Sequence, residues 1–201
     1  MVFIQELHGP KETMAQLKPL EHRNIVRLYC AYWASGSIYL VSEPSVISLR
    51  QIMMFRPSWG LEETAALSRG VLDGLMFVHN SLEIAHGSLS TDNIMLTWEG
   101  GVKLANIGSS IIDGKGREHS SGDLRSLARI IQNITEPASL LDEEPRLALK
   151  HPTGTDLDDF FAQLLTVKHV SDIIEHNFVK QAQGSDGLTR CVWKWWAAMC
   201  Y

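Results

Sequence analysis

The apolar positions of this chain follow two periods, one typical of strands and one typical of helices. Near the N-terminus, short runs rich in β-branched and aromatic residues are bounded by turn formers, and such runs predict strands. They lie at residues 2–4, 25–29 and 38–41. Between the first two, residues 11–21 are predicted to be helical, with Pro19 as an interruption.

Helical periodicity dominates the rest of the chain. Leu67, Val71, Leu75 and Val78 share one face of a long amphipathic helix predicted at 61–79. Shorter helices are predicted at 48–54, 123–134, 157–165 and 170–178, and a hairpin with strands 94–96 and 102–104 around a Gly-Gly turn. Segments 109–122, 141–145 and 151–154 are predicted to be loops. A few strands followed mostly by helices is the pattern of an α+β fold.

Composition and charge exclude several classes of protein. The 201 residues are 45% hydrophobic and 20% charged, as in ordinary globular domains, and the net charge of −5 disfavours binding to nucleic acid or anionic membranes. No apolar run is long enough to cross a bilayer, and no signal-peptide pattern is present. Cys30, Cys191 and Cys200 have no metal-ligand spacing, and their odd number fits a reducing compartment. We therefore expect a cytoplasmic protein.

Two short segments carry the most specific pattern in the chain: H-G-S-L-S-T-D-N at 86–93 and V-K-L-A-N-I-G at 102–108. The first resembles the catalytic loop of eukaryotic protein kinases, H-R-D-L-x-x-x-N, and the second resembles the strand and turn that carry their D-F-G motif. Further segments resemble kinase elements in the family's order: 20–28, 38–43, 74–79, 123–128 and 159–178. The resemblance covers most of the chain.

The resemblance implies a protein-kinase-like fold with a mostly helical large lobe and a truncated small-lobe remnant of about three strands and a short helix C. It divides the chain into the small-lobe remnant at 1–45, the large lobe at 46–182 and a tryptophan-rich tail at 183–201. It also implies that Asp123 anchors the backbone of the catalytic loop.

The residues that perform phosphoryl transfer in the family are nearly all replaced. Gln5 stands at the position of the phosphate-binding lysine, and Thr13 at that of its glutamate partner. Ser88 replaces the catalytic aspartate, and Ser90 replaces the lysine that follows it. No catalytic residue of the set is therefore intact at these positions.

The metal-binding positions are degenerate as well. Asn106 replaces the metal-binding aspartate, and Asn93 alone is retained as a second ligand, so Mg²⁺ binding is expected to be weak or absent. We expect both asparagines to stabilise loops and His86 to be a packed core histidine. No histidine is placed by the sequence to activate Ser88 as a nucleophile.

The resemblance also locates a remnant nucleotide pocket. Its residues are Phe3, Ser42, Glu43, Ser45 and Met95, with Ser42 at the gatekeeper position. Phe3 replaces the small alanine above the adenine ring, and we expect its side chain to fill the pocket.

Three functions are compatible with this pattern. The first is a catalytically inactive pseudokinase that acts through protein–protein interaction or allosteric scaffolding, without a cofactor and with other proteins, such as a kinase or signalling component, as partners. The second is a serine/threonine kinase that uses ATP and Mg²⁺ through an atypical site. The third is a non-functional kinase fragment. The three tryptophans at 193, 195 and 196 are expected to pack back onto the large lobe or to come from an imperfect gene model.

Overall fold

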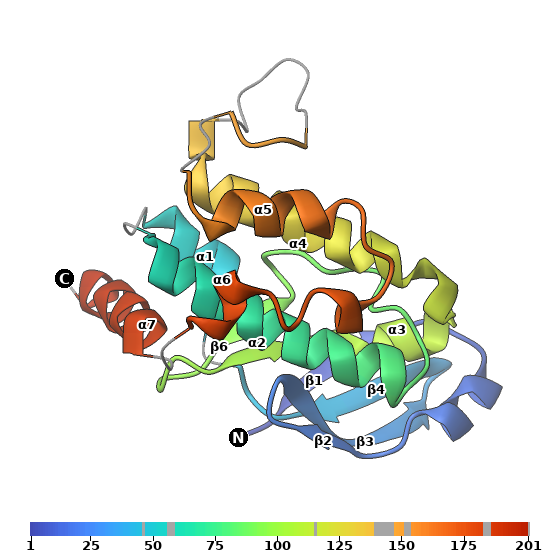
Figure 1. Ribbon diagram of the computed structural model, residues 1–201. Coiled ribbons are helices and arrows are strands. Elements are labelled where there is room, and N and C mark those ends of the chain that lie inside the picture. The colour runs from blue at the N-terminus through green and yellow to red at the C-terminus, as the bar shows by residue number, and fades with distance from the viewer. Residues whose placement is uncertain are drawn as a thin grey trace.

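The computed structural model describes residues 1–45, 47–55, 59–114, 116–138, 147–150, 154–182 and 186–200. The strands are β1 (Phe3–Leu7), β2 (Leu20–His22), β3 (Ile25–Ala34), β4 (Ser37–Ser42), β5 (Ile47–Ser48), β6 (Ile94–Leu96) and β7 (Val102–Leu104). Strands β1–β4 lie on one side of the molecule and most of the helices on the other (Figure 1). The strands form one seven-stranded sheet of order β1-β4-β3-β7-β6-β5, with β2 paired to β3.

The helices follow the first strands. They are α1 (Leu49–Met54), α2 (Leu61–Asn80), α3 (Ile107–Asp113), α4 (Ser120–Thr135), α5 (Asp156–Leu164), α6 (Asn177–Lys180) and α7 (Asp186–Met199). The 3-10 segments are η1 (Lys11–Gln16), η2 (Arg117–His119) and η4 (Val170–Asp172). This mixed architecture confirms the predicted α+β class and the truncated kinase-like fold. The domain boundaries predicted at 46 and 183 lie outside the described residues, as do the predicted loops at 141–145 and 151–153.

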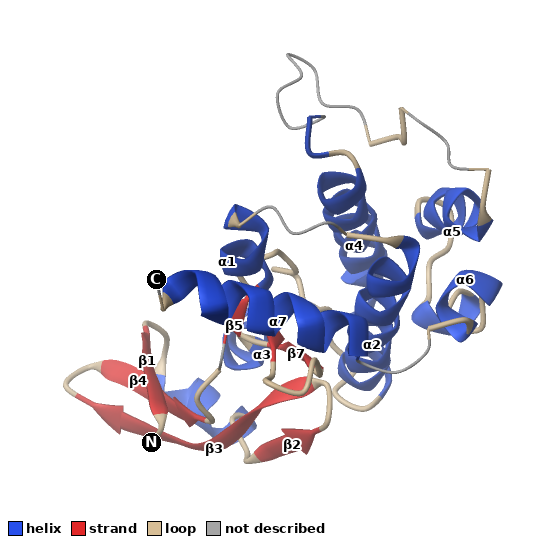
Figure 2. Cartoon of the chain, turned by 90° about the vertical axis from the view of Figure 1, so that its left-hand side faces the viewer, coloured by secondary structure: helices blue, strands red, loops and turns tan. Residues whose placement is uncertain are grey.

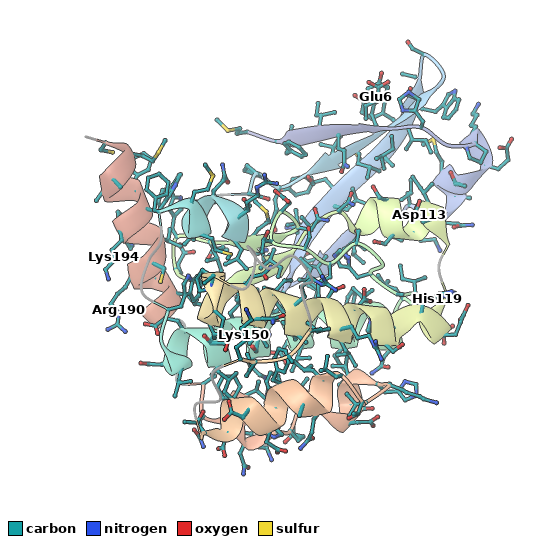
Figure 3. The ribbon with its side chains drawn as sticks, turned by 90° about the horizontal axis from the view of Figure 1, so that it is seen from above. Glu6, Asp113, His119, Lys150, Arg190 and Lys194 are labelled. Carbon is teal, nitrogen blue, oxygen red and sulfur yellow. The ribbon has the colours of Figure 1, made fainter. Side chains whose placement is uncertain are left out.

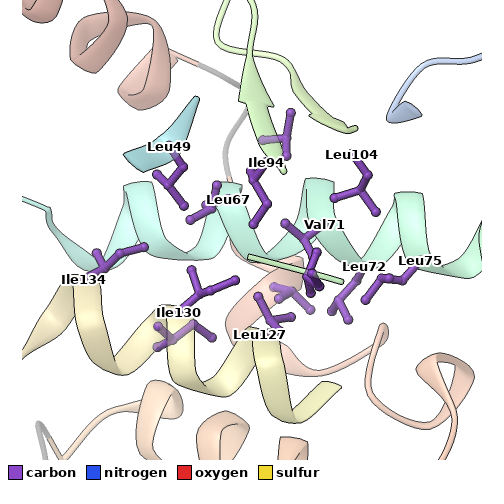
Figure 4. Close-up of a cluster of buried hydrophobic side chains, with 14 of the residues drawn as sticks. Leu49, Leu67, Val71, Leu72, Leu75, Ile94, Leu104, Leu127, Ile130 and Ile134 are labelled. Carbon is purple, nitrogen blue, oxygen red and sulfur yellow. The ribbon is translucent and has the colours of Figure 1, made fainter. Parts of the chain in front are cut away.

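Helix α2 is the centre of the core. Its predicted apolar face is fully buried, with Leu67, Val71 and Leu75 each at 0% exposure. The hairpin β6–β7 covers α2 on one side and α4 covers it on the other, as Figure 4 shows. Each such leucine or valine stabilises the fold by roughly 1.5–3 kcal/mol relative to exposure. Gly60 is the N-cap residue of this helix, and its N–H donates to the Glu63 carboxylate at 3.0 Å.

The helix predicted at 11–21 is wrong. Only η1 is helical there, and the chain then returns as β2, which pairs antiparallel with β3. Pro19 has no N–H to donate within a helix, so the chain leaves helical geometry ahead of β2. The short helix C implied by the resemblance is thus reduced to one 3-10 segment.

The predictions for 109–122 and 170–178 are also wrong. Helix α3 occupies much of the first segment, because Ile107 and Ser110 are buried and Gly114 ends the helix with a φ of 61°. In the second segment, only η4 and the start of α6 are helical. His176 caps α6 with its own ring, since Nδ1 accepts from Phe178 N–H at 3.1 Å, and this local bond competes with a continuous helix.

The tryptophan-rich tail forms α7. Leu188, Cys191 and Val192 bury one face of it, whereas Lys194 points away from the molecule (Figure 3). Arg190 pairs with Glu63 of α2 at 3.6 Å. Trp98, from the β6–β7 turn, contacts Trp193 and Trp196 at ring-centroid distances of 5.6 and 5.4 Å. The helix therefore packs onto the rest of the chain, and Trp195 packs against the main core, whereas Trp193 and Trp196 remain 53% and 43% exposed, so the expected packing of the tryptophans is found only in part. No helix in the described part of the chain is long and apolar enough to span a membrane.

Two glycines within helices provide a matched stability test. A Cβ on Gly74, in α2, would lie 2.9 Å from the backbone oxygen of Asn24, whereas a Cβ on Gly122, in α4, would meet nothing within 4 Å. We expect Gly74→Ala to lower the free energy of unfolding by about 1–3 kcal/mol despite its better helix propensity. Gly122→Ala should leave it unchanged or raise it by up to about 1 kcal/mol. Urea denaturation of both variants checks this, and equal effects would show that α2 does not pack as closely as described.

Candidate functional site

A single pocket collects most of the positions that the sequence singled out. It has a volume of about 600 Å³, which is adequate for a small organic ligand, and it lies between β1, the segment that leads into β6 and the segment that follows β7. The predicted site residues in its lining are Phe3, Gln5, Ser42, Ser45, Asn93, Met95 and Asn106. Apolar side chains, among them Leu28, Leu40 and Ile107, complete the wall.

The polar end of the pocket is built on a hydrogen bond between two neutral amides. Gln5 Nε2 donates to Asn106 Oδ1 at 3.1 Å and so joins β1 to the turn that precedes α3. Ser109 Oγ donates to the same oxygen at 2.6 Å. Asn106 has a left-handed backbone, with a φ of 68°, a conformation that asparagine adopts more easily than most residues. The two positions that carry lysine and aspartate in active kinases are therefore paired here without any charge.

The same network extends into the loop at 86–93. Asn106 Nδ2 donates to Ser88 Oγ at 3.4 Å, and Asn93 Nδ2 donates to the Ser88 carbonyl at 2.7 Å. Both asparagines thus stabilise loops, as expected from the sequence.

Ser88 lies nearer to a histidine than the sequence suggested. Its Oγ is 3.4 Å from His86 Nδ1, a pairing missed because the two residues stand only two apart on one irregular loop. That distance exceeds the 2.6–3.2 Å expected of a nucleophile and its base. The exposed Ser88 hydroxyl therefore serves as a bridge between His86 and Asn106.

Asp123 holds the loop in place from beneath. Its carboxylate, 2% exposed, accepts the backbone N–H groups of His86 and Gly87, both at 2.8 Å. His79 Nε2 lies 2.8 Å from the same carboxylate. The anchoring role that the resemblance implied is confirmed, but Asp123 is not the first residue of its helix, since α4 begins at Ser120.

His86 is a core residue rather than an acid or base. It is 2% exposed, and its Nε2 lies 3.0 Å from the Ala105 carbonyl, which can only accept, so Nε2 carries the proton of the neutral ring. Burial lowers the pKa of the His86 imidazole below its ordinary value, and the charge of Asp123 only partly opposes this effect.

Five predicted site residues lie outside the pocket lining: His86 and Ser88, described above, and Thr13, Ser90 and Glu43. Thr13 is in η1 and donates to the Pro10 carbonyl at 2.7 Å. The Ser90 carbonyl accepts from Asn93 N–H at 3.1 Å. Glu43 accepts from Lys103 Nζ and, at 2.9 Å, from Arg27 N–H. In the structure the side chains of Thr13 and Glu43 and the backbone of Ser90 stabilise their local segments.

Phe3 does not fill the pocket as expected. It lines the wall with 57% of its surface exposed, and the cavity of about 600 Å³ remains beside it. The reason is its position on the first strand of the sheet, where no described strand lies on the outer side of β1 to press the ring inward.

Gln51 and Asp92 also line the pocket; the sequence did not point to Gln51, and the side chain of Asp92 was expected to point elsewhere. Asp92 is the one ionised side chain among the described lining residues. It is half-exposed and pairs with Arg50 at 3.2 Å. Its position next to the retained Asn93 was the feature of the sequence that could have indicated it as a lining residue.

The donor set does not fit a magnesium ion well. Mg²⁺ prefers carboxylate and water oxygens in octahedral geometry. Asn106 Oδ1 already accepts two hydrogen bonds, from Gln5 and Ser109, and the Asn93 amide is tied to the Ser88 carbonyl. Gly108, the last residue of the second motif, serves packing, because a Cβ there would lie 2.2 Å from Leu40 Cδ1.

Comparison with known proteins agrees with this geometry. The family model described as "Protein kinase domain" matches residues 8–124, which is more than half of the chain. The chain belongs to the protein kinase family. Both motif segments, at 86–93 and 102–108, lie within the matched residues.

Several serine/threonine-protein kinases are similar to part of the chain. Serine/threonine-protein kinase Tao of Drosophila melanogaster is 36% identical over 97 residues, 48% of this chain and 9% of that protein. Serine/threonine-protein kinase 10 of Xenopus tropicalis is 30% identical over 108 residues, 53% of this chain and 11% of that protein. Serine/threonine-protein kinase WNK of Caenorhabditis elegans is 29% identical over 115 residues, 52% of this chain and 6% of that protein. The matched region thus spans about a tenth or less of each relative's length.

Burial of neutral His86 predicts a specific loss of stability in acid. The unfolded chain binds a proton with the ordinary histidine pKa of about 6.5, whereas folded His86 resists protonation. The free energy of unfolding should therefore be insensitive to this group above about pH 6.5 and fall below that pH, by up to about 1.4 kcal/mol per pH unit. His86→Gln should reduce the slope of the free energy of unfolding against pH, because one fewer group takes up a proton on unfolding.

Urea denaturation at several pH values between neutrality and mild acid measures both slopes. His22, whose pKa burial also lowers, is present in both proteins and cancels from the comparison. Parallel pH profiles for the two proteins would contradict the assignment to His86.

Proposed function

We propose that this chain is a pseudokinase, a kinase-family domain that transfers no phosphate and acts by binding other proteins. The observation that carries the proposal is the neutral hydrogen bond between Gln5 and Asn106 at the polar end of the pocket. Phosphoryl transfer depends on a lysine for the phosphates and on metal ions held by carboxylates. Gln5 and Asn106 supply neither charge.

The electrostatics of the pocket support this proposal. A nucleotide triphosphate is strongly anionic, and its binding energy comes largely from cations and charge-assisted hydrogen bonds. No lysine or arginine side chain is among the described residues of the lining, and its one ionised side chain, Asp92, is negative. Phosphates placed at the polar end would thus meet amides and a carboxylate.

The loop chemistry supports the same conclusion. Ser88 has no carboxylate that could accept a proton from a substrate hydroxyl. Such general-base catalysis typically contributes about 10²–10⁴-fold to the rate. The Ser88 hydroxyl is instead part of the bridge from His86 to Asn106. On this proposal the domain needs no cofactor, its partners are proteins such as a kinase or another signalling component, and it works in the cytoplasm.

A second candidate is an active serine/threonine kinase with an atypical site. It is favoured by the volume of the pocket, about 600 Å³, and by the retained Asn93 in its lining. This function requires ATP and Mg²⁺ to bind despite the neutral Gln5–Asn106 pair. A measurement of nucleotide binding therefore distinguishes the active kinase from the pseudokinase.

We expect ATP to leave the melting temperature of the chain unchanged, with or without Mg²⁺ or Mn²⁺. A ligand at a hundred times its dissociation constant would stabilise the native state by about 2.7 kcal/mol, so even modest binding is measurable by thermal shift. The double variant Gln5→Lys/Asn106→Asp introduces the lysine and the carboxylate that active kinases have at these positions and should gain a metal-dependent shift. Asn106→Asp alone is the control, because it adds a carboxylate without the lysine.

A metal-dependent shift of the unmodified chain, or phosphate transfer that Asn93→Ala abolishes, would overturn the pseudokinase proposal in favour of the active kinase. Adding Ser88→Asp to the double variant tests the missing base separately, because it should affect transfer and not nucleotide binding.

The third possibility, a non-functional fragment, predicts poor folding of the N-terminal part. Against it, Leu17, Leu28, Ile38 and Leu40 form a second buried cluster between η1 and the sheet. We expect a single cooperative thermal transition, followed by far-UV circular dichroism and tryptophan fluorescence. Broad or non-coincident transitions would favour the fragment.

A further inference from the structure

A second cavity is lined by the first turns of α2 and α5 and by α6. Helices α5 and α6 lie side by side, and α6 packs against α2 (Figure 2). The cavity has a volume of about 510 Å³, within the range of about 300–1,000 Å³ that is typical of ligand sites. It shares no described lining residue with the pocket beside Gln5 and Asn106, so it is a separate site.

Apolar side chains line part of this cavity. Ala65 and Phe178 belong to the main core and are each only 4% exposed, whereas Leu61 is 43% exposed. An exposed leucine beside two buried apolar side chains offers a contact surface to the aliphatic part of a ligand, and covering it removes apolar area from water.

The polar side chains of the lining offer hydrogen-bond acceptors. Glu62 is in the first turn of α2 and Asp156 in the first turn of α5, and both are exposed. Gln181 Nε2 donates to Asp156 Oδ2 at 3.0 Å, which leaves the side-chain oxygen of Gln181 as an acceptor. No lysine or arginine is among the described lining residues. This set of groups disfavours an anion and suits a cation that donates hydrogen bonds.

Glu62 differs from other acidic residues in the same two first turns. Acidic residues are common at such positions because they interact favourably with the helix dipole. Glu63, however, pairs with Arg190 at 3.6 Å, and Asp159 Oδ2 lies 2.9 Å from His176 Nε2. In the described part of the chain, no hydrogen bond or ion pair engages the Glu62 side chain. A cation in the cavity would therefore meet this carboxylate without a competing partner from the described residues.

We propose that this cavity binds an arginine side chain of a partner protein. The planar guanidinium has five N–H donors, enough for Glu62, Asp156 and the Gln181 oxygen. The aliphatic stem of the arginine packs against Leu61 and Phe178. A lysine ammonium is compact and more strongly hydrated, so it matches acceptors from three helices less well. The proposal goes beyond the pseudokinase function and does not depend on it, because the two cavities are separate.

An NMR titration of the isotope-labelled chain tests the proposal, with the capped peptide acetyl-Leu-Arg-Leu-amide as the probe. We expect saturable shifts confined to the backbone amides of the segments that line the cavity, around 61–65, 155–156 and 178–181. The same peptide with citrulline in place of arginine is similar in shape but uncharged, and it should bind about fivefold more weakly or worse. Saturable binding elsewhere, equal binding of the two peptides or the absence of saturable shifts overturns the proposal.

Matched variants separate this site from a general attraction between a cationic peptide and a chain of net charge −5. Glu62→Gln/Asp156→Asn should weaken binding by about fivefold or more, because both carboxylates of the cavity are lost. Glu99→Gln/Asp113→Asn removes the same charge at exposed positions outside both cavities and should change the affinity by less than about twofold. Equal losses in the two double variants contradict the site. The amide spectra also report whether each variant is folded, and the citrulline peptide tests the site without any variant.

Discussion

The buried carboxylate of Asp123 is the contact on which the candidate site depends. Removing an ionised carboxylate from water is costly unless hydrogen bonds replace the lost solvent. Here two backbone N–H groups and His79 Nε2 surround it, each at 2.8 Å. The backbone at His86 and Gly87 is thereby fixed on α4, and the positions of Ser88 and Asn93 follow. Because this anchor serves the fold, it can persist after the chemistry of the loop has changed.

Above that anchor, a neutral hydrogen bond joins two positions that carry charged residues in active kinases. Gln5 reaches Asn106 across 101 residues of sequence, through a neutral hydrogen bond. Such a bond contributes only about 0.5–1.5 kcal/mol to stability, but it needs no counter-ion and no ligand. A lysine and an aspartate in its place would attract phosphate and metal. The neutral pair thus joins β1 to the turn before α3 independently of nucleotide.

The parts of the structure that depend on local periodicity were predictable from the sequence. The apolar stripe of α2 and the Gly-Gly hairpin are examples, and both are confirmed. The errors arose where a distant partner or a side-chain cap decides the local structure. Ser110 stabilises α3 by donating to the His86 carbonyl at 2.6 Å, and His176 caps α6 with its own ring. Within the site, motif spacing located both loops, whereas the exposed position of Phe3 depends on the order of strands, which spacing alone does not give.

The persistence of the pocket follows from packing and does not by itself imply a nucleotide. Leu28 and Leu40 belong to the buried cluster beneath the sheet, and Ile107 belongs to the main core, so the same side chains that stabilise the fold also form the pocket wall. Gly108 is held by contact with Leu40 rather than by any phosphate. A domain can therefore lose its catalytic charges and keep its cavity, since the two depend on different residues. Charge, rather than the presence of a cavity, therefore distinguishes a pseudokinase from an active kinase at this site, and the Gln5–Asn106 pair carries no charge.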